Sequence, residues 1–369
     1  MYNECIQLTR QFAFCPNAFR VDLYKGCDFG CRYCFANMDW AQEKQRGNWA
    51  EADIHKLEKL FYKALETDKE SKDILVELIR HRVPIHCGGM SDPFQNREWE
   101  LHKTKDFIKL SNKYNYPVQF STKTDFLQDD YYYILNPEIH AFQVSIIGYD
   151  DEFVKKWECN TPTAKARINF VKELRNLGFW CGVRIQPLLD ITQAEKLCYN
   201  LIDIPSYITI EHFKLVLDTK SSKNAFLSLC EHKGDYIISN HKLEVRRDIK
   251  VRNIERLKKI LKNIPVGVGD NDLHYLSDSR CCCGIDLAGP AFENYLKYNL
   301  TYMATGDFEA GTFIPKCNPR KHINDQKYGL KIDCKQYVED YIDLHKDYLG
   351  SRRSSIEKRL FGVSAKKLF

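Results

Sequence analysis

The sequence Cys27-Asp28-Phe29-Gly30-Cys31-Arg32-Tyr33-Cys34 places three cysteines within eight residues. It follows an alternating apolar run over residues 19–24 and then Gly26, a pattern that predicts a strand and the loop that leaves it. Three thiolates that turn inward around Gly30 can hold three irons of a cubane cluster and leave the fourth iron without a protein ligand. The spacing therefore predicts an iron-sulfur site at the end of a strand.

Two other interpretations of these cysteines are a zinc site and buried thiols that behave as small hydrophobic side chains. Asp28, Gly30 and Arg32 suit a loop better than a core strand, which counts against buried thiols. Zinc would need a fourth ligand, most often from a second CxxC pair, and no such pair lies nearby in the sequence. A zinc-stabilised binding module stays as the non-enzymatic alternative, and elemental analysis for iron and zinc would separate the two.

The CxxxCxxC spacing with an aromatic residue, Tyr33, before the last cysteine resembles the signature of the radical S-adenosylmethionine (SAM) superfamily. Three further stretches resemble the branch that includes spore photoproduct lyase, and the resemblance covers about residues 15–215: Tyr24-Lys25-Gly26, Ser91-Asp92-Pro93-Phe94 and Ser121-Thr122-Lys123. It implies a [4Fe-4S] cluster on Cys27, Cys31 and Cys34, whose open iron chelates SAM, with Tyr33 at the SAM site. It also implies reductive cleavage of SAM to a 5′-deoxyadenosyl radical, with electrons from a donor such as flavodoxin or ferredoxin.

The composition is that of a soluble globular protein, with 44% hydrophobic and 28% charged residues among 369. No apolar run reaches membrane-spanning length and the first residues lack an export signal, so we expect a cytoplasmic protein without a membrane partner. In a reducing compartment, the 15 cysteines are expected to be metal ligands and buried thiols, not disulfides. The net charge of +5 does not by itself indicate a polyanionic partner.

Alternating strand-like and helix-like segments predict a parallel α/β architecture. Apolar runs predict six strands and one further candidate strand at 265–269. Helical periodicity predicts helices between the strands, one of them over residues 98–112. The six strands lie at 19–24, 83–87, 118–121, 142–147, 179–185 and 207–213. They match the partial (β/α)6 TIM-like barrel that the resemblance implies, in which the chemistry lies at the C-terminal strand ends. We expect a radical SAM core over residues 1–220 and a mixed, partly helical extension over 221–369 that forms one wall of the substrate site.

Small and polar residues follow the second predicted strand. Gly88 and Gly89 would let the backbone approach a ligand closely, and in the superfamily this position receives the methionine amino group of SAM. The resemblance assigns Ser91 and Asp92 to the SAM ammonium group or ribose. A polar turn fixed by Pro93 is the alternative interpretation.

Polar residues also end the next three strands. Lys123 would supply a cation for the SAM carboxylate, a role that the matching lysine has in the family that the sequence resembles. The same resemblance places Ser145 at the ribose or carboxylate of SAM. Arg184 and Gln186 are predicted contacts of SAM or substrate, because a core strand does not bury an arginine without an anion.

Two pairs of residues remain ambiguous. Glu158 and Arg167 also resemble the branch, but an ion pair at a helix start explains them equally well. In spore photoproduct lyase a tyrosine and a cysteine return a hydrogen atom to the product, and Phe35 and Met90 replace them here. Cys87 is the candidate substitute donor, so the resemblance carries the fold and the cofactor but not the repair reaction.

Cys281, Cys282 and Cys283 form a second cysteine group. Successive residues of an extended segment point to opposite sides, so two of the three, with Cys317 or Cys334, could hold an auxiliary cluster or zinc. A substrate-facing thiol donor, for which Cys282 is the candidate, and inert buried thiols are the other interpretations.

Two substrate classes stay open. The lyase-like motifs and basic side chains favour a nucleic acid or nucleotide and therefore a DNA-binding modification or repair enzyme, whether a lyase, a transferase or an oxidoreductase. The modest net charge and the missing hydrogen donors favour a peptide or small metabolite. The basic side chains are those within residues 352–367 and Lys316, Arg320, Lys321 and Lys327.

Overall fold

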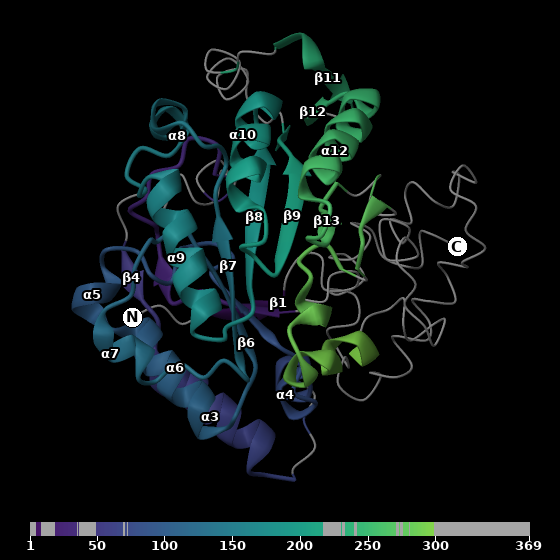
Figure 1. The fold of residues 1–369 in the computed structure, drawn as a ribbon. Helices are drawn as coiled ribbons and strands as arrows, with labels where there is room; N and C mark the ends of the chain where they lie inside the picture. Colours follow the sequence, from purple (N-terminus) through teal and green to yellow (C-terminus); the bar gives the residue numbers. More distant parts are fainter. Residues whose placement is uncertain are drawn as a thin grey trace.

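An eight-stranded sheet forms the centre of the computed structural model, with strand order β1-β2-β5-β6-β7-β8-β9-β13 (Figure 1). All neighbouring strands pair in parallel except β1, which runs antiparallel at one edge. The strands are β1 Ile6–Leu8, β2 Phe19–Val21, β5 Ile85–Cys87, β6 Val118–Thr122, β7 His140–Ser145, β8 Cys181–Leu188, β9 Tyr207–His212 and β13 Val266–Val268. The structure describes residues 5–8, 19–34, 36, 49–68, 71, 73–216, 230, 233–239, 242–270, 273, 276–279 and 281–298.

The six predicted strands are present in the predicted order, which confirms the α/β class. The candidate strand at 265–269 is β13, which pairs with β9, whereas β1 was not predicted because three residues are too short for a periodicity signal. Since β13 lies beyond residue 220, the sheet includes part of the predicted extension as well as the predicted core. The division at residue 220 itself stays a prediction.

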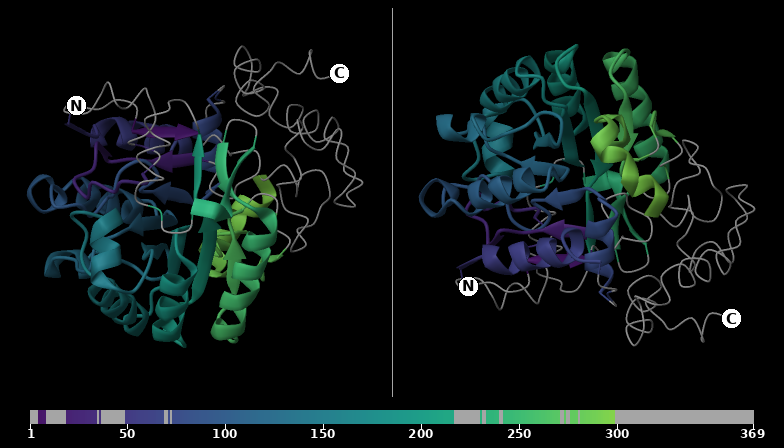
Figure 2. Two further views of the ribbon diagram at one scale, coloured as in Figure 1. Left: turned by 90° about the horizontal axis from the view of Figure 1, so that it is seen from above. Right: turned by 90° about the horizontal axis from the view of Figure 1, so that it is seen from below.

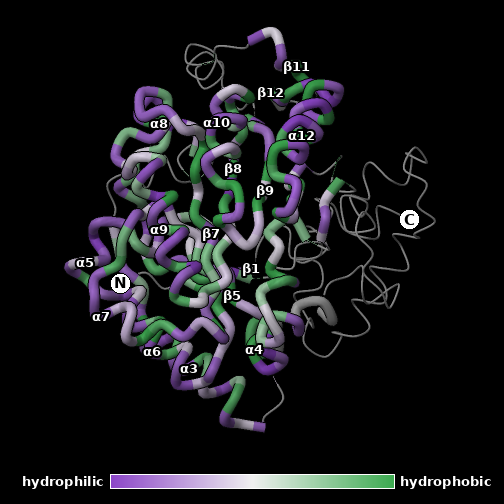
Figure 3. The backbone as a smooth tube through the Cα atoms, viewed as in Figure 1, coloured by the Kyte–Doolittle hydropathy of each residue, from purple (hydrophilic) through white to green (hydrophobic). Residues whose placement is uncertain are grey.

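Helices surround the outer side of the curved sheet (Figure 2). Helix α3 buries Leu57, Phe61 and Ala64, whose spacing of four and three residues places them on one side of the helix. Much of the central strands is green in Figure 3, which marks hydrophobic residues, as expected for parallel strands in the interior of the fold. The helices over this face are α3 Ile54–Leu65, α4 Ile74–Arg80, α6 Lys103–Lys113, α9 Ala164–Asn176, α10 Ile191–Leu201 and α12 Arg247–Leu261; shorter ones are α7 Asp129–Tyr132 and α8 Asp151–Trp157.

The helix predicted over residues 98–112 is two helices, α5 Glu98–Leu101 and α6 Lys103–Lys113. His102 lies between them in the left-handed region, with φ of 54°. The buried Glu98 carboxylate accepts hydrogen bonds of 2.9 Å from the backbone N–H of Thr104 and of Lys105. An acid that binds the free N–H groups of a helix start stabilises a break at this point, which periodicity alone does not reveal.

A smaller antiparallel sheet of order β10-β12-β11 lies beyond the C-terminal ends of the main strands (Figure 1). Its strands are β10 Lys214–Val216, β11 Tyr236–Ser239 and β12 Lys242–Val245, and a third sheet pairs β3 Tyr24–Lys25 with β4 Ala50–Glu51. Two 3-10 helices, η3 Ile285–Leu287 and η4 Pro290–Tyr298, end the described chain. Among the described residues no helix is long and apolar enough to cross a membrane. Several residues of the sequence analysis lie outside the described residues: Phe35, Cys317, Cys334 and all the basic side chains between 316 and 367.

Candidate functional site

The three cysteines of the CxxxCxxC stretch lie on the loop that follows β3, where Gly26 and Gly30 adopt φ of +93° and +62°. Cys27, Cys31 and Cys34 belong to one apolar cluster. The same cluster includes Phe213 and Leu215 near β10 and Leu243 on β12, so the cysteine loop and the small sheet share a core at the C-terminal ends of the strands. This is the end of a parallel α/β sheet at which active sites form.

The segment between α8 and α9 holds the cysteine loop from one side. Arg32 N donates to Trp157 O at 2.8 Å, and Cys31 forms an isolated antiparallel bridge with Glu158. Asn160 donates from Nδ2 to the carbonyl of Asp28 at 2.8 Å. Backbone contacts of this kind fix the path of the loop while leaving the cysteine side chains to other partners.

Gln95 holds the loop from the other side. Its Oε1 accepts from Asp28 N at 3.0 Å, and its Nε2 donates to Gly26 O at 3.2 Å. The Gln95 side chain is fully buried, so each of these hydrogen bonds replaces a lost bond to water. Sequence reasoning missed this residue, because only its place two positions after Pro93 marks it.

A buried ion pair between Glu158 and Arg167 lies beside the loop, with Oε2 and Nη2 2.7 Å apart and neither side chain exposed. Glu158 also accepts hydrogen bonds from the Tyr33 hydroxyl and from Thr161 Oγ1. Arg167 donates from Nη1 to the carbonyl of Ser145, the last residue of β7, at 2.6 Å. Burial alone would raise the pKa of Glu158, but Arg167 and Lys123 outweigh it and hold that pKa below its usual value. The pair therefore connects the cysteine loop to the end of a central strand.

The residues of the loop fit a [4Fe-4S] cluster by their donor chemistry. Three thiols are available, and burial raises the pKa of Cys27 to about 12, so this thiol keeps its proton unless a metal replaces it. Lys123 lies above the Tyr33 ring, with Nζ 5.9 Å from its centroid, and supplies a positive charge near Cys31. Within the described residues no three His, Cys, Asp or Glu side chains converge as for a single metal ion, so the fit rests on donor type and grouping.

Gly88 and Gly89 are explained by close packing at the end of β5. A Cβ on Gly88 would lie 2.4 Å from the carbonyl oxygen of Ser121, and its φ is +102°. A Cβ on Gly89 would lie 2.5 Å from Arg20 Cδ. Gly88 therefore lets the end of β5 pack directly against the backbone of β6, whereas a side chain at position 89 would displace the Arg20 side chain.

Ser91 and Asp92 make internal hydrogen bonds in the loop after β5. Ser91 Oγ donates to Tyr24 O at 2.7 Å, while Asp92 accepts from Thr122 Oγ1 at 2.8 Å and from Lys123 N at 2.7 Å. Burial raises the pKa of Asp92 to about 6, against the lowering effect of these donors. The pair thus joins the ends of β3, β5 and β6, next to the cysteine loop.

Lys123 follows β6 and lies among acidic groups. Burial would lower its pKa, but Cys31, Glu158 and Asp92 raise it above the usual value, so the ammonium group stays charged. Ser145 ends β7 beside Arg184, which is its register partner on β8. The structure therefore places the predicted SAM residues Lys123 and Ser145 and the predicted SAM or substrate contact Arg184 on or just after neighbouring strands.

A polar network crosses the face of the sheet opposite the helices, which we call the inner face. His86 Nε2 lies 2.8 Å from Ser121 Oγ, and Arg184 donates from Nη1 to the same hydroxyl at 3.3 Å. Arg184 also donates to Gln186 Oε1, and Gln186 Nε2 donates to Glu211. His86 and Glu211 were not predicted, although each alternates along its strand with buried neighbours that face the other side.

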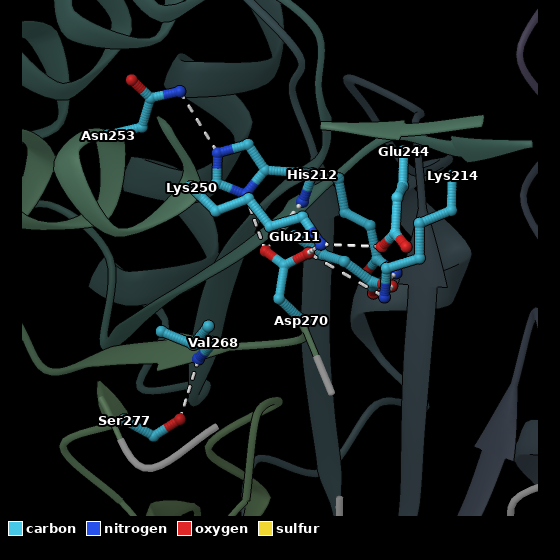
Figure 4. A network of polar contacts seen from close by, with 10 residues as sticks. Glu211, His212, Lys214, Glu244, Lys250, Asn253, Val268, Asp270 and Ser277 are labelled. Atoms are coloured by element: carbon cyan, nitrogen blue, oxygen red, sulfur yellow. Dashed lines mark hydrogen bonds and ion pairs between the residues drawn. The ribbon is translucent and has the colours of Figure 1, made fainter. Parts of the chain in front are cut away.

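The network continues from Glu211 into a buried group between β9, β13, α12 and β12 (Figure 4). Asp270 Oδ2 lies 2.7 Å from His212 Nδ1, and both side chains are fully buried. Burial would raise the pKa of Asp270, but His212, Lys214 and Lys250 hold it well below its usual range. Lys214 pairs with Glu211 at 2.9 Å and Lys250 with Glu244 at 3.0 Å, so ion pairs join the small sheet to β9 and to α12.

Cys87 lies on the face of β5 opposite His86, level with Phe120, and is fully buried in the apolar core. Burial raises the pKa of its thiol well above the ordinary value. This place on the helix-covered face gives the predicted hydrogen-donor role no support.

The Cys281–Cys283 segment lies across the inner face. Its three carbonyl groups accept hydrogen bonds from Tyr207, Thr209 and Gln143, at 3.0, 2.8 and 3.0 Å. Cys281 Sγ and Cys283 Sγ are 3.5 Å apart, so two of the three thiols lie side by side, and Cys282 is half-buried.

Comparison with known proteins agrees with this geometry. A family model described as the radical SAM superfamily matches residues 21–196. An uncharacterized protein of Mycobacterium tuberculosis and one of Mycobacterium bovis are each 25% identical over 185 residues, which are 47% of this chain and 50% of each relative. The chain thus spans about half the length of the curated relatives it matches.

Solved structures of spore photoproduct lyase share the fold. A mutant with bound AdoMet and dinucleoside spore photoproduct, and the enzyme complexed with dinucleoside spore photoproduct, each match with a TM-score of 0.50 at 15% identity. Each match covers 71% of this chain and 80% of the lyase chain. Residues 21–196 thus match the radical SAM superfamily of enzymes, and the chain is similar in fold to spore photoproduct lyase. The match to this superfamily implies SAM and a [4Fe-4S] cluster as cofactors.

Proposed function

We propose that this chain is a radical SAM enzyme that holds a [4Fe-4S] cluster on Cys27, Cys31 and Cys34. When bound, such a cluster supplies the electron that cleaves SAM to methionine and a 5′-deoxyadenosyl radical, which abstracts hydrogen from a substrate. The observation that carries the proposal is the grouping of three thiols on one loop, at the C-terminal strand ends, with the Lys123 ammonium group beside them. A reducing donor such as flavodoxin or ferredoxin completes the reaction.

The side chains around the loop have separate tasks in this proposal. Lys123 binds the SAM carboxylate as a point charge, and Ser145 contacts the carboxylate or ribose from the end of β7. The backbone after Gly88, whose course Ser91 and Asp92 fix through hydrogen bonds, receives the amino group of SAM. The apolar cluster that includes Phe29 and Tyr33 keeps water from the reacting groups.

A nucleic acid or a nucleotide is the substrate class that we propose. Support comes from the fold, which spore photoproduct lyase shares and in whose solved structure a dinucleoside is bound. The basic residues between 316 and 367 of the sequence add support, because Lys and Arg that neutralise phosphates are the usual basis of nucleic-acid affinity. A peptide or a small metabolite is the alternative, favoured by the modest net charge of +5.

Anaerobic reduction of the reconstituted protein with SAM tests the activity. A panel of DNA, RNA, nucleotides and peptides is scored for 5′-deoxyadenosine released above the substrate-free level. Release stimulated by an oligonucleotide or nucleotide supports the proposal, whereas stimulation by peptides alone moves the enzyme to the alternative class. Binding by fluorescence anisotropy at two salt concentrations, before and after truncation at Leu349, checks the basic segment, because each phosphate contact adds roughly 0.7–0.9 to the slope of log affinity against log salt.

The Cys281–Cys283 segment is proposed as the site of an auxiliary cluster or zinc. Two adjacent thiols, Cys281 and Cys283, could supply half of a four-ligand set, with Cys317 as a further ligand. Iron and zinc per chain in a Cys281→Ser/Cys283→Ser variant decide this: loss of metal beyond that of the first cluster is expected, and an unchanged metal content would leave only the thiol-donor and inert interpretations.

A further inference from the structure

We propose that Arg184 binds an anionic group of the substrate on the inner face of the sheet, a proposal that rests on the radical SAM function above. Arg184 lies on β8, level with Ser145 on β7 and Thr209 on β9. Its hydrogen-bond partners are all neutral. Nε lies 3.0 Å from Gln186 Oε1, Nη2 donates to the same oxygen, and Nη1 lies 3.3 Å from Ser121 Oγ.

The other cations of this region have acidic partners. Arg20 pairs with Asp22 at 2.6 Å, and Lys214 pairs with Glu211 at 2.9 Å. Lys123 lies near Cys31, Glu158 and Asp92 and is assigned to the SAM carboxylate in the proposed function. In the part of the chain that the structure describes, Arg184 has no carboxylate within 4.0 Å. One positive charge on the inner face is therefore left for an anion.

The guanidinium group of Arg184 is held ready for such an anion. Burial, together with the positive charges of Arg184 and Arg20, lowers the pKa of His86 to about 3, so His86 is neutral. A neutral His86 Nε2 can accept the Ser121 hydroxyl proton, which leaves the Ser121 oxygen to accept from Arg184. Gln186 is fixed in turn by its bond to Glu211. Anchoring by neutral groups keeps the guanidinium in place without cancelling its charge, and its planar fork matches the oxygens of a phosphate or carboxylate.

The side chains around Arg184 are partly exposed. Arg184, Gln186 and His86 are each half-buried, in contrast to the fully buried Arg167, whose charge Glu158 cancels. The Cys281–Cys283 segment binds Thr209 and Gln143 on the same face, and the cysteine loop lies at the strand ends. A substrate whose anionic group reaches Arg184 would thus have its remaining atoms between this segment and the cysteine loop, next to the SAM site.

Paired ligands that differ only in charge test the proposal on the reconstituted enzyme with SAM bound. One arm compares the four deoxynucleoside 5′-monophosphates with the matching nucleosides, and the other compares N-acetylglutamate with N-acetylglutamine, by anaerobic calorimetry. We expect the anionic member of one pair to bind roughly 10- to 100-fold more tightly, the range for a hydrogen bond to a charged group. Arg184→Gln is expected to reduce this ratio to near one, Arg184→Lys to an intermediate value, and neither to change SAM affinity or iron content.

Arg82→Gln is the matched control, because Arg82 also donates only to neutral oxygens, at 2.9 and 3.1 Å. Arg82 precedes β5, at the N-terminal end of this strand, away from the cysteine loop. A ratio that falls in this control, or that survives in Arg184→Gln, overturns the proposal. A large loss of SAM affinity in both Arg184 variants also overturns it, since Arg184 would then serve the cofactor. If only N-acetylglutamate binds more tightly than its neutral partner, the anion site at Arg184 is supported and a nucleotide substrate is not. The proposal for Arg184 and the proposal for the substrate class can therefore fail separately.

Discussion

Replacing Glu158 with glutamine removes one charge of the buried ion pair and retains the shape of the side chain. The Arg167 guanidinium would then remain fully buried, 2.7 Å from a neutral group, with Lys123 as a second positive charge nearby. Breaking a buried pair on one side costs about 3–5 kcal/mol. Because the substituted glutamine could still accept from the Tyr33 hydroxyl, this loss would be mostly electrostatic. We expect the free energy of unfolding in urea to fall by about that amount.

Glu195→Gln is the control for Glu158→Gln, since Glu195 also pairs with an arginine, Arg256, at 2.7 and 2.8 Å, but on the surface. Exposed pairs contribute about 0.2–1 kcal/mol, so this variant should lose far less stability. The double variant Glu158→Gln/Arg167→Met should recover much of the loss, because no unpaired charge remains. Equal losses of stability in the Glu158→Gln and Glu195→Gln variants would refute the reasoning. A double variant that is less stable than Glu158→Gln alone would also refute it, because the two substitutions would then act independently.

Three further predictions follow from single side chains. Lys123→Ala should weaken SAM binding about tenfold or more at unchanged iron content, which equilibrium binding measures, and an unchanged dissociation constant would reassign this residue. Gly88→Ala should destabilise the fold, because its φ of +102° and the carbonyl of Ser121 leave no room for a Cβ; a melting temperature equal to that of the native chain would count against this packing. Asp270→Asn should make the free energy of unfolding less dependent on pH in acid. Because the pKa of Asp270 is lowered in the folded state, its carboxylate stabilises the fold above the unfolded pKa of about 4, and this stabilisation is lost as the pH falls towards the lower folded pKa. An unchanged pH dependence would show that the Asp270–His212 pair contributes nothing.

The sequence was sufficient for the order of the strands and for the cysteine loop, because both depend on local patterns. Periodicity located β6 to within one residue and placed Lys123 just beyond its end. The roles of Gln95, His86 and Glu211 could not be read in this way, since each depends on contacts between residues far apart in the chain.

The pair of Glu158 and Arg167 shows the same limit. The sequence explained these two residues equally well as an ion pair at a helix start and as a feature of the family. Only the fold shows that the pair joins the cysteine loop to β7. For the Cys281–Cys283 segment, alternation correctly separates one thiol from the other two, but its position across the inner face comes from side chains of β7 and β9. The break of the predicted 98–112 helix at His102 likewise depends on the burial of Glu98, a tertiary property.

The central claim is that Cys27, Cys31 and Cys34 together hold the cluster that cleaves SAM. Its most direct test is a triple alanine variant, reconstituted anaerobically with iron and sulfide, reduced, and assayed for iron, visible absorbance and 5′-deoxyadenosine. The account predicts loss of the brown absorbance that these cysteines confer and complete loss of SAM cleavage, with circular dichroism like that of the native chain. Cleavage of SAM that survives in this variant would contradict it.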